Sequence, residues 1–143
     1  MKRIAIQGRQ GSFHDIAAHQ YFAGEQIQLI FCATFEQVYD CMKADPTVIG
    51  LTAIENTIAG SLLHNYELLR ASGATVVGEH KLHIEHCICC LPDDDWGDIT
   101  EVHSHPVALA QCNAFLARHQ QIKAVEAEAV SYTHLTLPTN REV

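Results

Sequence analysis

Residues 53–61 read Ala-Ile-Glu-Asn-Thr-Ile-Ala-Gly-Ser, and they stand where an apolar run gives way to a helical pattern. The short apolar run over residues 48–54 (VIGLTAI) predicts a buried strand. Apolar side chains then recur at helical spacing, namely Leu62, Leu63, Tyr66, Leu68 and Leu69. Because open α/β sheets bind ligands beyond the carboxyl ends of their strands, this junction is the first candidate site.

Two further strand patterns precede this junction, at residues 3–7 (RIAIQ) and 27–32 (IQLIFC). Each is followed by an amphipathic helical pattern, the first beginning at Ser12 and the second after Thr34. Three strand-then-helix units in succession predict a parallel sheet with right-handed crossovers. We therefore expect a first α/β lobe over residues 1–74.

The pattern changes after Ser72-Gly73, and residues 75–129 are expected to begin a second lobe. A helix is predicted from Pro106 onward, because proline suits a first helical turn, where its missing N–H costs nothing. Short strands are predicted on both sides of this helix, at residues 75–78, 82–91, 99–103 and 122–125.

Residues 130–143 fit neither a periodic pattern nor a turn that follows from the preceding chain. Residues 130–139 (VSYTHLTLPT) can be written in codons that match a transposase-type sequencing adapter read in frame. Ala129 supplies the two adapter bases before them. We therefore interpret residues 130–143 as a non-native tail and leave them out of the fold argument.

The composition narrows the class of protein. Among 143 residues, 48% are hydrophobic and 18% are charged, which is ordinary for a chain with a packed core. The formal net charge of -8 disfavours nucleic acids and anionic membrane surfaces as partners. Because no apolar segment reaches the roughly twenty residues that span a bilayer and no secretion signal stands at the start, we expect a cytoplasmic protein. The six cysteines are then expected to be reduced thiols.

Three serines stand at predicted helix starts. A helix start offers unpaired backbone N–H groups, a hydroxyl and the positive end of the helix dipole, which together suit an anion. Each serine taken alone is better explained as a structural cap. Together they indicate a cleft for a small molecule with more than one carboxylate. The residues concerned are Ser12 beside Gly11, Ser61 beside Gly60, and Ser104 beside His105.

The segment Glu55-Asn56-Thr57 adds polar groups beside the second serine. Asn56 can both donate and accept hydrogen bonds, so it either binds a carboxylate or hydroxyl or caps a turn. Glu55 would repel a carboxylate, and we expect it to have an orienting or structural role. From its context alone, Gln111 is a solvated side chain, and His105 is a helix-start residue rather than a general base.

Residues 83–90 (HIEHCICC) are rich in side chains that bind metals. On a strand, alternate residues face opposite sides, so Cys87 and Cys89 would share one face while His86 and Cys90 share the other. Because the ligands are divided and no second group with zinc-like spacing follows, we expect buried strand cysteines and no metal site. A metal-binding interaction domain that uses these histidines and cysteines is the alternative.

Four motifs in register resemble the successive signatures of prephenate dehydratase, which arogenate dehydratases share. The order and spacing match the family over about residues 3–128. The motifs lie at residues 8–15 (GRQGSFHD), 53–61 (AIENTIAGS), 65–69 (NYELL) and 104–112 (SHPVALAQC).

The resemblance implies a two-lobed α/β fold similar to type II periplasmic solute-binding proteins, with prephenate in the cleft between the lobes. It implies decarboxylative dehydration of prephenate to phenylpyruvate in phenylalanine biosynthesis, and homo-oligomers in the full-length enzymes. No metal or organic cofactor is expected, because aromatisation supplies the driving force. By motif, the substrate-binding residues would be Ser12, Asn56, Thr57, Ser61, Ser104 and Gln111, supported by Gly11, Glu55, Gly60 and His105.

The chain also departs from the family. The Thr-Arg-Phe motif, whose threonine is the usual candidate acid, is absent, and so are the Ser/Thr-Ala-rich segment before it and the C-terminal ACT domain. Val107 stands where a glutamine is frequent. We therefore expect a fold truncated within the second lobe and a chain without dehydratase activity. The alternatives are an arogenate dehydratase and a cytoplasmic module of the same fold that binds small dicarboxylates.

Overall fold

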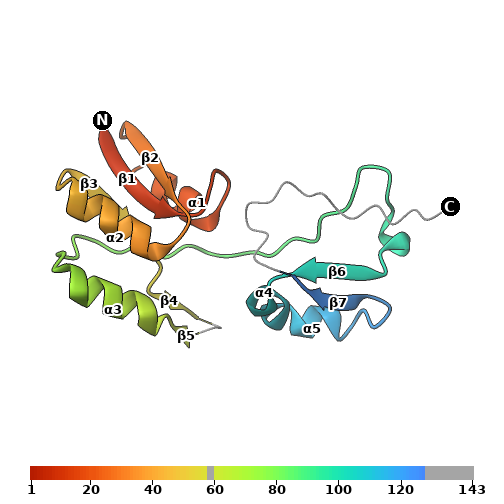
Figure 1. Ribbon diagram of the computed structural model, residues 1–143. Coiled ribbons are helices and arrows are strands. Elements are labelled where there is room, and N and C mark those ends of the chain that lie inside the picture. Colours follow the sequence, from red (N-terminus) through yellow and green to blue (C-terminus); the bar gives the residue numbers. More distant parts are fainter. Residues whose placement is uncertain (58–59, 128–143) are drawn as a thin grey trace. The chain divides into compact units, whose positions relative to one another are not determined.

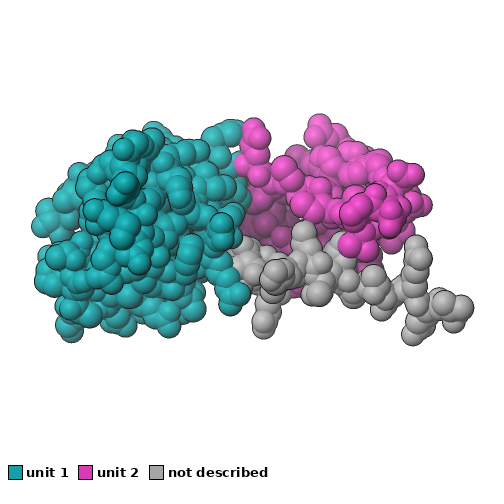
Figure 2. Space-filling view, turned by 90° about the horizontal axis from the view of Figure 1, so that it is seen from above, with its two compact units in different colours: residues 1–84 teal, residues 85–143 magenta. Residues whose placement is uncertain are grey.

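The computed structural model describes residues 1–57 and 60–127 (Figure 1). The chain divides into two compact units, Met1–Ile84 and Glu85–Val143 (Figure 2). The lobe boundary that the sequence indicated after residue 74 stays a prediction. Within the described residues, no helix is long and apolar enough to cross a membrane.

A three-stranded parallel sheet in the order β2-β1-β3 forms the centre of the first unit (Figure 1). Its strands are β1 (Lys2–Gln7), β2 (Ile27–Cys32) and β3 (Val48–Leu51). In the middle of the sheet, Ile4 of β1 lies opposite Leu29 on one side and Ile49 on the other. The expected parallel sheet is therefore confirmed, although its third strand ends at Leu51 rather than at residue 54.

Two helices cover opposite faces of this sheet. Neighbouring residues of a strand point to opposite sides, so each helix packs against alternate residues of β1. Ile4 and Ile6 form a buried cluster with Ala18 of helix α1 (Phe13–Tyr21). Ala5 faces the other way and packs in a second cluster with Val38 of helix α2 (Phe35–Ala44). Ile4, Ala5, Ile6, Ala18 and Val38 are each 0% exposed, so the buried centre of this unit lies along β1.

Both helices begin at the cap residues that the sequence indicated. Ser12 Oγ accepts a hydrogen bond from the backbone N of Asp15 at 3.3 Å, and Thr34 Oγ1 accepts one from Gln37 N at 3.4 Å. A capping side chain satisfies a backbone N–H that has no partner within the helix, which fixes where the helix starts.

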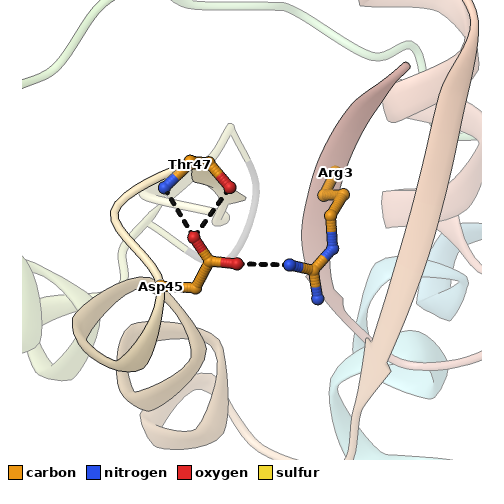
Figure 3. A network of polar contacts seen from close by, with 3 residues as sticks. All are labelled: Arg3, Asp45 and Thr47. Atoms are coloured by element: carbon orange, nitrogen blue, oxygen red, sulfur yellow. Dashed lines mark hydrogen bonds and ion pairs between the residues drawn. The ribbon is translucent and has the colours of Figure 1, made fainter.

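The turn between α2 and β3 is tied to β1 by Asp45 (Figure 3). One carboxylate oxygen of Asp45 accepts two hydrogen bonds from Thr47. The backbone N of Thr47 donates one at 2.9 Å, and its hydroxyl donates the other at 2.7 Å. The other oxygen pairs with the guanidinium of Arg3. The hydrogen bonds from Thr47, assisted by the charge of Arg3, lower the pKa of Asp45.

A short hairpin and a third helix follow β3. The hairpin consists of β4 (Glu55–Asn56) and β5 (Gly60–Ser61), and helix α3 (Leu63–Ser72) packs against α2. The N-cap of α3 is Leu62, so the expectation that Ser61 starts this helix is wrong. Ser61 belongs to the hairpin instead, because its backbone pairs with Glu55.

Residues 74–84 belong to the first unit and form neither a helix nor a strand. His80 Nε2 lies 3.0 Å from Gln20 Oε1, and its ring contacts Tyr21 at the end of α1. The predicted strands at residues 75–78 and 82–91 are therefore wrong, because the structure has no strand in either range. These runs are apolar, but the described chain offers them no partner strand, and a strand persists when its backbone groups are paired.

The second unit has a parallel pair of strands, β6 (Glu101–Ser104) and β7 (Lys123–Glu126), joined through helices α4 (Pro106–Gln111) and α5 (Asn113–Leu116). A 3-10 turn, η1 (Trp96–Asp98), precedes β6. The rings of Trp96 and Phe115 both contact His119. The single helix expected after Pro106 is thus two short helices that meet at Cys112.

Candidate functional site

Two of the sequence motifs follow neighbouring strands of the parallel sheet. Residues 8–15 come directly after β1, and the hairpin comes a few residues after β3. Since β1 and β3 pair in parallel, their carboxyl ends lie at the same edge of the sheet. In open α/β sheets this edge is where ligands bind.

The first motif makes a turn whose polar groups satisfy one another. Gly8 has φ +109, and a Cβ placed on it would lie 2.9 Å from Ser12 Oγ. Asp15 folds back so that its Oδ2 accepts a hydrogen bond from Gly11 N at 2.6 Å. Ser12 and Asp15 are both 7% exposed, so the predicted anion site at this helix start already contains a buried carboxylate.

Sequence reasoning missed His14 in the same turn. Its ring meets Phe35 edge-on with centroids 5.4 Å apart, and its Nε2 is buried without a hydrogen-bond partner. Burial lowers the pKa of His14, which favours the neutral imidazole at neutral pH. The sequence could have indicated His14 as a candidate site residue, because it lies within the motif at residues 8–15.

In the hairpin motif, two hydroxyl side chains donate hydrogen bonds to one carboxylate oxygen of Glu55. Tyr66 of α3 donates its hydroxyl proton to Glu55 Oε1 at 3.1 Å. Ser61 donates to the same oxygen at 3.4 Å. Asn56 lies half-buried opposite Gly60 across the hairpin. Tyr66 was expected only as an apolar helix position, so its role as a hydrogen-bond donor was missed.

Asn65 holds the start of α3 against the strand side of this motif. Its side chain is 2% exposed, and its Nδ2 donates to the carbonyl oxygen of Ala53 at 2.7 Å. The backbone N of Leu62 donates to Ile54 O at 2.9 Å. These bonds fix the position of α3 relative to the hairpin, and therefore fix Tyr66 beside Glu55.

In the second unit the candidate residues lie at the end of β6 and along α4. The cap of α4 is His105, whose Nδ1 accepts from Val107 N at 3.2 Å, so the expectation that Ser104 caps this helix is wrong. Ser104 is the last residue of β6 and pairs with β7. The side chain of Gln111 is not only solvated, because His86 Nε2 donates a hydrogen bond to its Oε1 at 2.6 Å.

Among the residues that the structure describes, no group of three or more His, Cys, Asp and Glu side chains could hold a metal ion. All six cysteines lie in this part of the chain, and none forms a disulfide. Cys87, Cys89 and Cys90 are exposed, so the expectation that they are buried in a strand is wrong. Cys32 and Cys41 lie together beneath the sheet, and burial, followed by the bond to Cys41, raises the pKa of Cys32 to about 11.

The fold and these motifs define the class: an α/β protein with polar groups gathered at the carboxyl edge of a parallel sheet. The family model described as prephenate dehydratase matches residues 4–136, and the chain belongs to that family. The match extends beyond residue 129. The interpretation of residues 130–143 as a non-native tail stays a prediction, because these residues lie outside those that the structure describes.

Known relatives agree with this assignment. A bifunctional chorismate mutase/prephenate dehydratase of Escherichia coli strain K12 is 34% identical over 131 residues, which are 90% of this chain and 34% of the relative. An arogenate dehydratase/prephenate dehydratase of Arabidopsis thaliana is 31% identical over 81% of this chain and 30% of the relative. The crystal structure of prephenate dehydratase from Staphylococcus aureus superposes with a TM-score of 0.77 at 25% identity, covering 91% of this chain and 48% of that one. The chain thus spans about a third of the length of these curated relatives.

Proposed function

We propose that this chain supplies substrate-binding residues of an enzyme that converts prephenate to phenylpyruvate, with loss of water and carbon dioxide, in phenylalanine biosynthesis. The observation that carries this proposal is the family match over residues 4–136, which includes all four motifs. The reaction needs a site that holds a dianion and lets a proton reach the departing hydroxyl. No cofactor enters the proposal, because aromatisation drives the reaction.

The proposed binding residues supply hydrogen bonds rather than full positive charges. Asn56 and Thr57 stand at the hairpin beside the carboxyl edge of the sheet, and Gln111 is held in place by His86. Because the chain carries a net charge of -8, a dianion must be attracted by such local donors. The full proposed set is Ser12, Asn56, Thr57, Ser61, Ser104 and Gln111, supported by Gly11, Glu55, Gly60 and His105.

The proposal includes a two-lobed architecture like that of type II periplasmic solute-binding proteins, with lobes over residues 1–74 and 75–129. Support comes from the parallel order β2-β1-β3 in the first unit and the parallel pair β6-β7 in the second. A cytoplasmic location and a homo-oligomeric full-length enzyme complete the proposal.

Binding of prephenate to the purified chain, measured by calorimetry, tests this function. Wild type should bind saturably, and Asn56→Ala should weaken binding about two- to tenfold, because one hydrogen bond contributes about 0.5–1.5 kcal/mol. Asn113→Ala is the matched control, because this exposed asparagine lies on α5 outside the motifs. Absence of saturable binding to wild type would refute the proposal.

Arogenate dehydratase is a second candidate, favoured by the match to the Arabidopsis protein. Arogenate carries an ammonium group where prephenate carries a ketone, so tighter binding of arogenate would select this alternative. Equal binding of simple dicarboxylates such as succinate would instead favour a general dicarboxylate-binding module.

A further inference from the structure

The hairpin holds Glu55 and Ser61 in a fixed relation. Their backbones pair directly across the antiparallel strands β4 and β5, which brings the two side chains to the same side of the hairpin. Tyr66 reaches the same carboxylate from the first turn of α3. Two hydroxyl groups, from β5 and from α3, therefore converge on Glu55 Oε1.

The chemistry of these groups sets the direction of each hydrogen bond. An ionised carboxylate is acceptor-only, whereas a hydroxyl has one proton to donate and two lone pairs. Tyr66 and Ser61 must therefore both act as donors toward Glu55. With its proton directed to Glu55, Ser61 can offer lone pairs alone to any further partner.

This direction conflicts with an anion site at Ser61. A ligand carboxylate needs a donor, and it would also meet the negative charge of Glu55. A ligand hydroxyl has a proton to give and is suited to both features. Ser61 is therefore suited to accept a hydrogen bond from the ligand rather than to bind an anion.

We propose that Glu55 is a positioning residue which, anchored by Tyr66, makes Ser61 an acceptor for the ring hydroxyl of the ligand rather than a donor to its carboxylate. This inference rests on the proposed function, because prephenate supplies the hydroxyl. At neutral pH the two carboxylates and the ketone of prephenate are acceptors, and its ring hydroxyl is its donor.

The network itself can be tested without any ligand. Desolvation, followed by the hydrogen bond and charge of Glu55, raises the pKa of Tyr66. Alkaline titration of the tyrosine ring carbons by NMR, with Tyr66 assigned by Tyr66→Phe, should show this pKa falling in Glu55→Gln. Glu67→Gln, which removes a neighbouring charge on the same helix, should change it less. An unchanged Tyr66 titration in Glu55→Gln would overturn the positioning role.

The role of Ser61 is tested with two stable ligands, 1-(carboxymethyl)cyclohexane-1-carboxylate with and without a hydroxyl on ring carbon 4. Both carry two carboxylates, and they differ only in the hydroxyl. Wild type should bind the hydroxylated member about two- to tenfold more tightly, the range of one hydrogen bond. Ser61→Ala should remove this preference, Ser61→Thr should retain it, and Glu55→Gln should reduce it.

The possible results separate the two claims. If Ser61→Ala weakens both ligands equally, Ser61 donates to a carboxylate and the inference is overturned. If wild type binds neither these ligands nor prephenate, the proposed function fails, whereas the Tyr66 titration still decides whether Glu55 positions Ser61.

Discussion

His64 Nε2 on α3 lies 2.6 Å from Glu36 Oε1 on α2, and this contact joins the two helices that pack together in the first unit. The hydrogen bond from His64 is the main reason why the pKa of Glu36 is lowered from 4.5 to about 2. A carboxyl whose pKa is lower in the folded state than in the unfolded state stabilises the fold above the unfolded pKa. That stabilisation is lost as the pH falls through the folded pKa.

We therefore expect wild type to lose stability more steeply than Glu36→Gln between about pH 4.5 and about pH 2. The measurement is the urea midpoint across this interval. Glu67→Gln, an exposed glutamate on α3, should keep the wild-type slope. Parallel pH profiles for wild type and Glu36→Gln would contradict the role of the His64 contact.

Gly8→Ala should destabilise the first unit by roughly 1–3 kcal/mol, because alanine is strained in this backbone conformation. Gly8 has φ +109, and its added Cβ would press on Ser12. Gly97→Ala is the matched control, since a Cβ there meets open space, and it should change stability by less than about 0.5 kcal/mol. If chemical denaturation shows that Gly8→Ala lowers stability as little as Gly97→Ala does, the turn at Gly8 tolerates a side chain.

Gly50→Ala should cost about 1–3 kcal/mol for a different reason, which is overpacking beneath α2. A Cβ on Gly50 would overlap Met42 Sδ and lie 3.1 Å from Val38 Cγ1. Shortening Met42 to alanine removes the first of these atoms, so Gly50→Ala should cost less in a Met42→Ala background. Strict additivity in this double-mutant cycle would argue that the two sites do not touch.

The chain as written should not convert prephenate to phenylpyruvate above the buffer rate, because it lacks the Thr-Arg-Phe motif that would provide the acid. Formation of phenylpyruvate, followed by its absorbance in alkali, checks this. The bifunctional Escherichia coli relative serves as the positive control. Turnover by this chain would mean that a residue within it supplies the proton.

Protein purified without added metal should contain well under one equivalent of zinc, because the described part of the chain has no suitable cluster of ligands. Elemental analysis measures this directly. Stoichiometric zinc that disappears in Cys87→Ser would instead support the metal-binding alternative.

Regular local patterns were the part of the fold that sequence predicted well. The strand at residues 27–32 and the caps at Ser12 and Thr34 agree with the structure, because apolar periodicity and capping chemistry act within a few residues. The predicted strands at residues 75–78 and 82–91 failed for the opposite reason. An apolar run does not reveal whether a partner strand is present.

The candidate site was predictable in its position but not in its internal contacts. The motif around Asn56 was located from its place after a strand, whereas the partners of its neighbours come from further along the chain. Tyr66 is 11 residues from Glu55, and Gln111 is 25 residues from His86. Such pairings depend on how helices pack, which the sequence pattern of either residue does not contain.

The order β2-β1-β3 has a consequence for synthesis on the ribosome. All three strands lie within residues 2–51, and so do α1 and α2, which cover the two faces of the sheet. Domains generally fold as units during translation, with the N-terminal one first. A nascent chain that has emerged through residue 51 therefore already contains everything that surrounds β1, so its most buried strand can be enclosed before the second unit is translated.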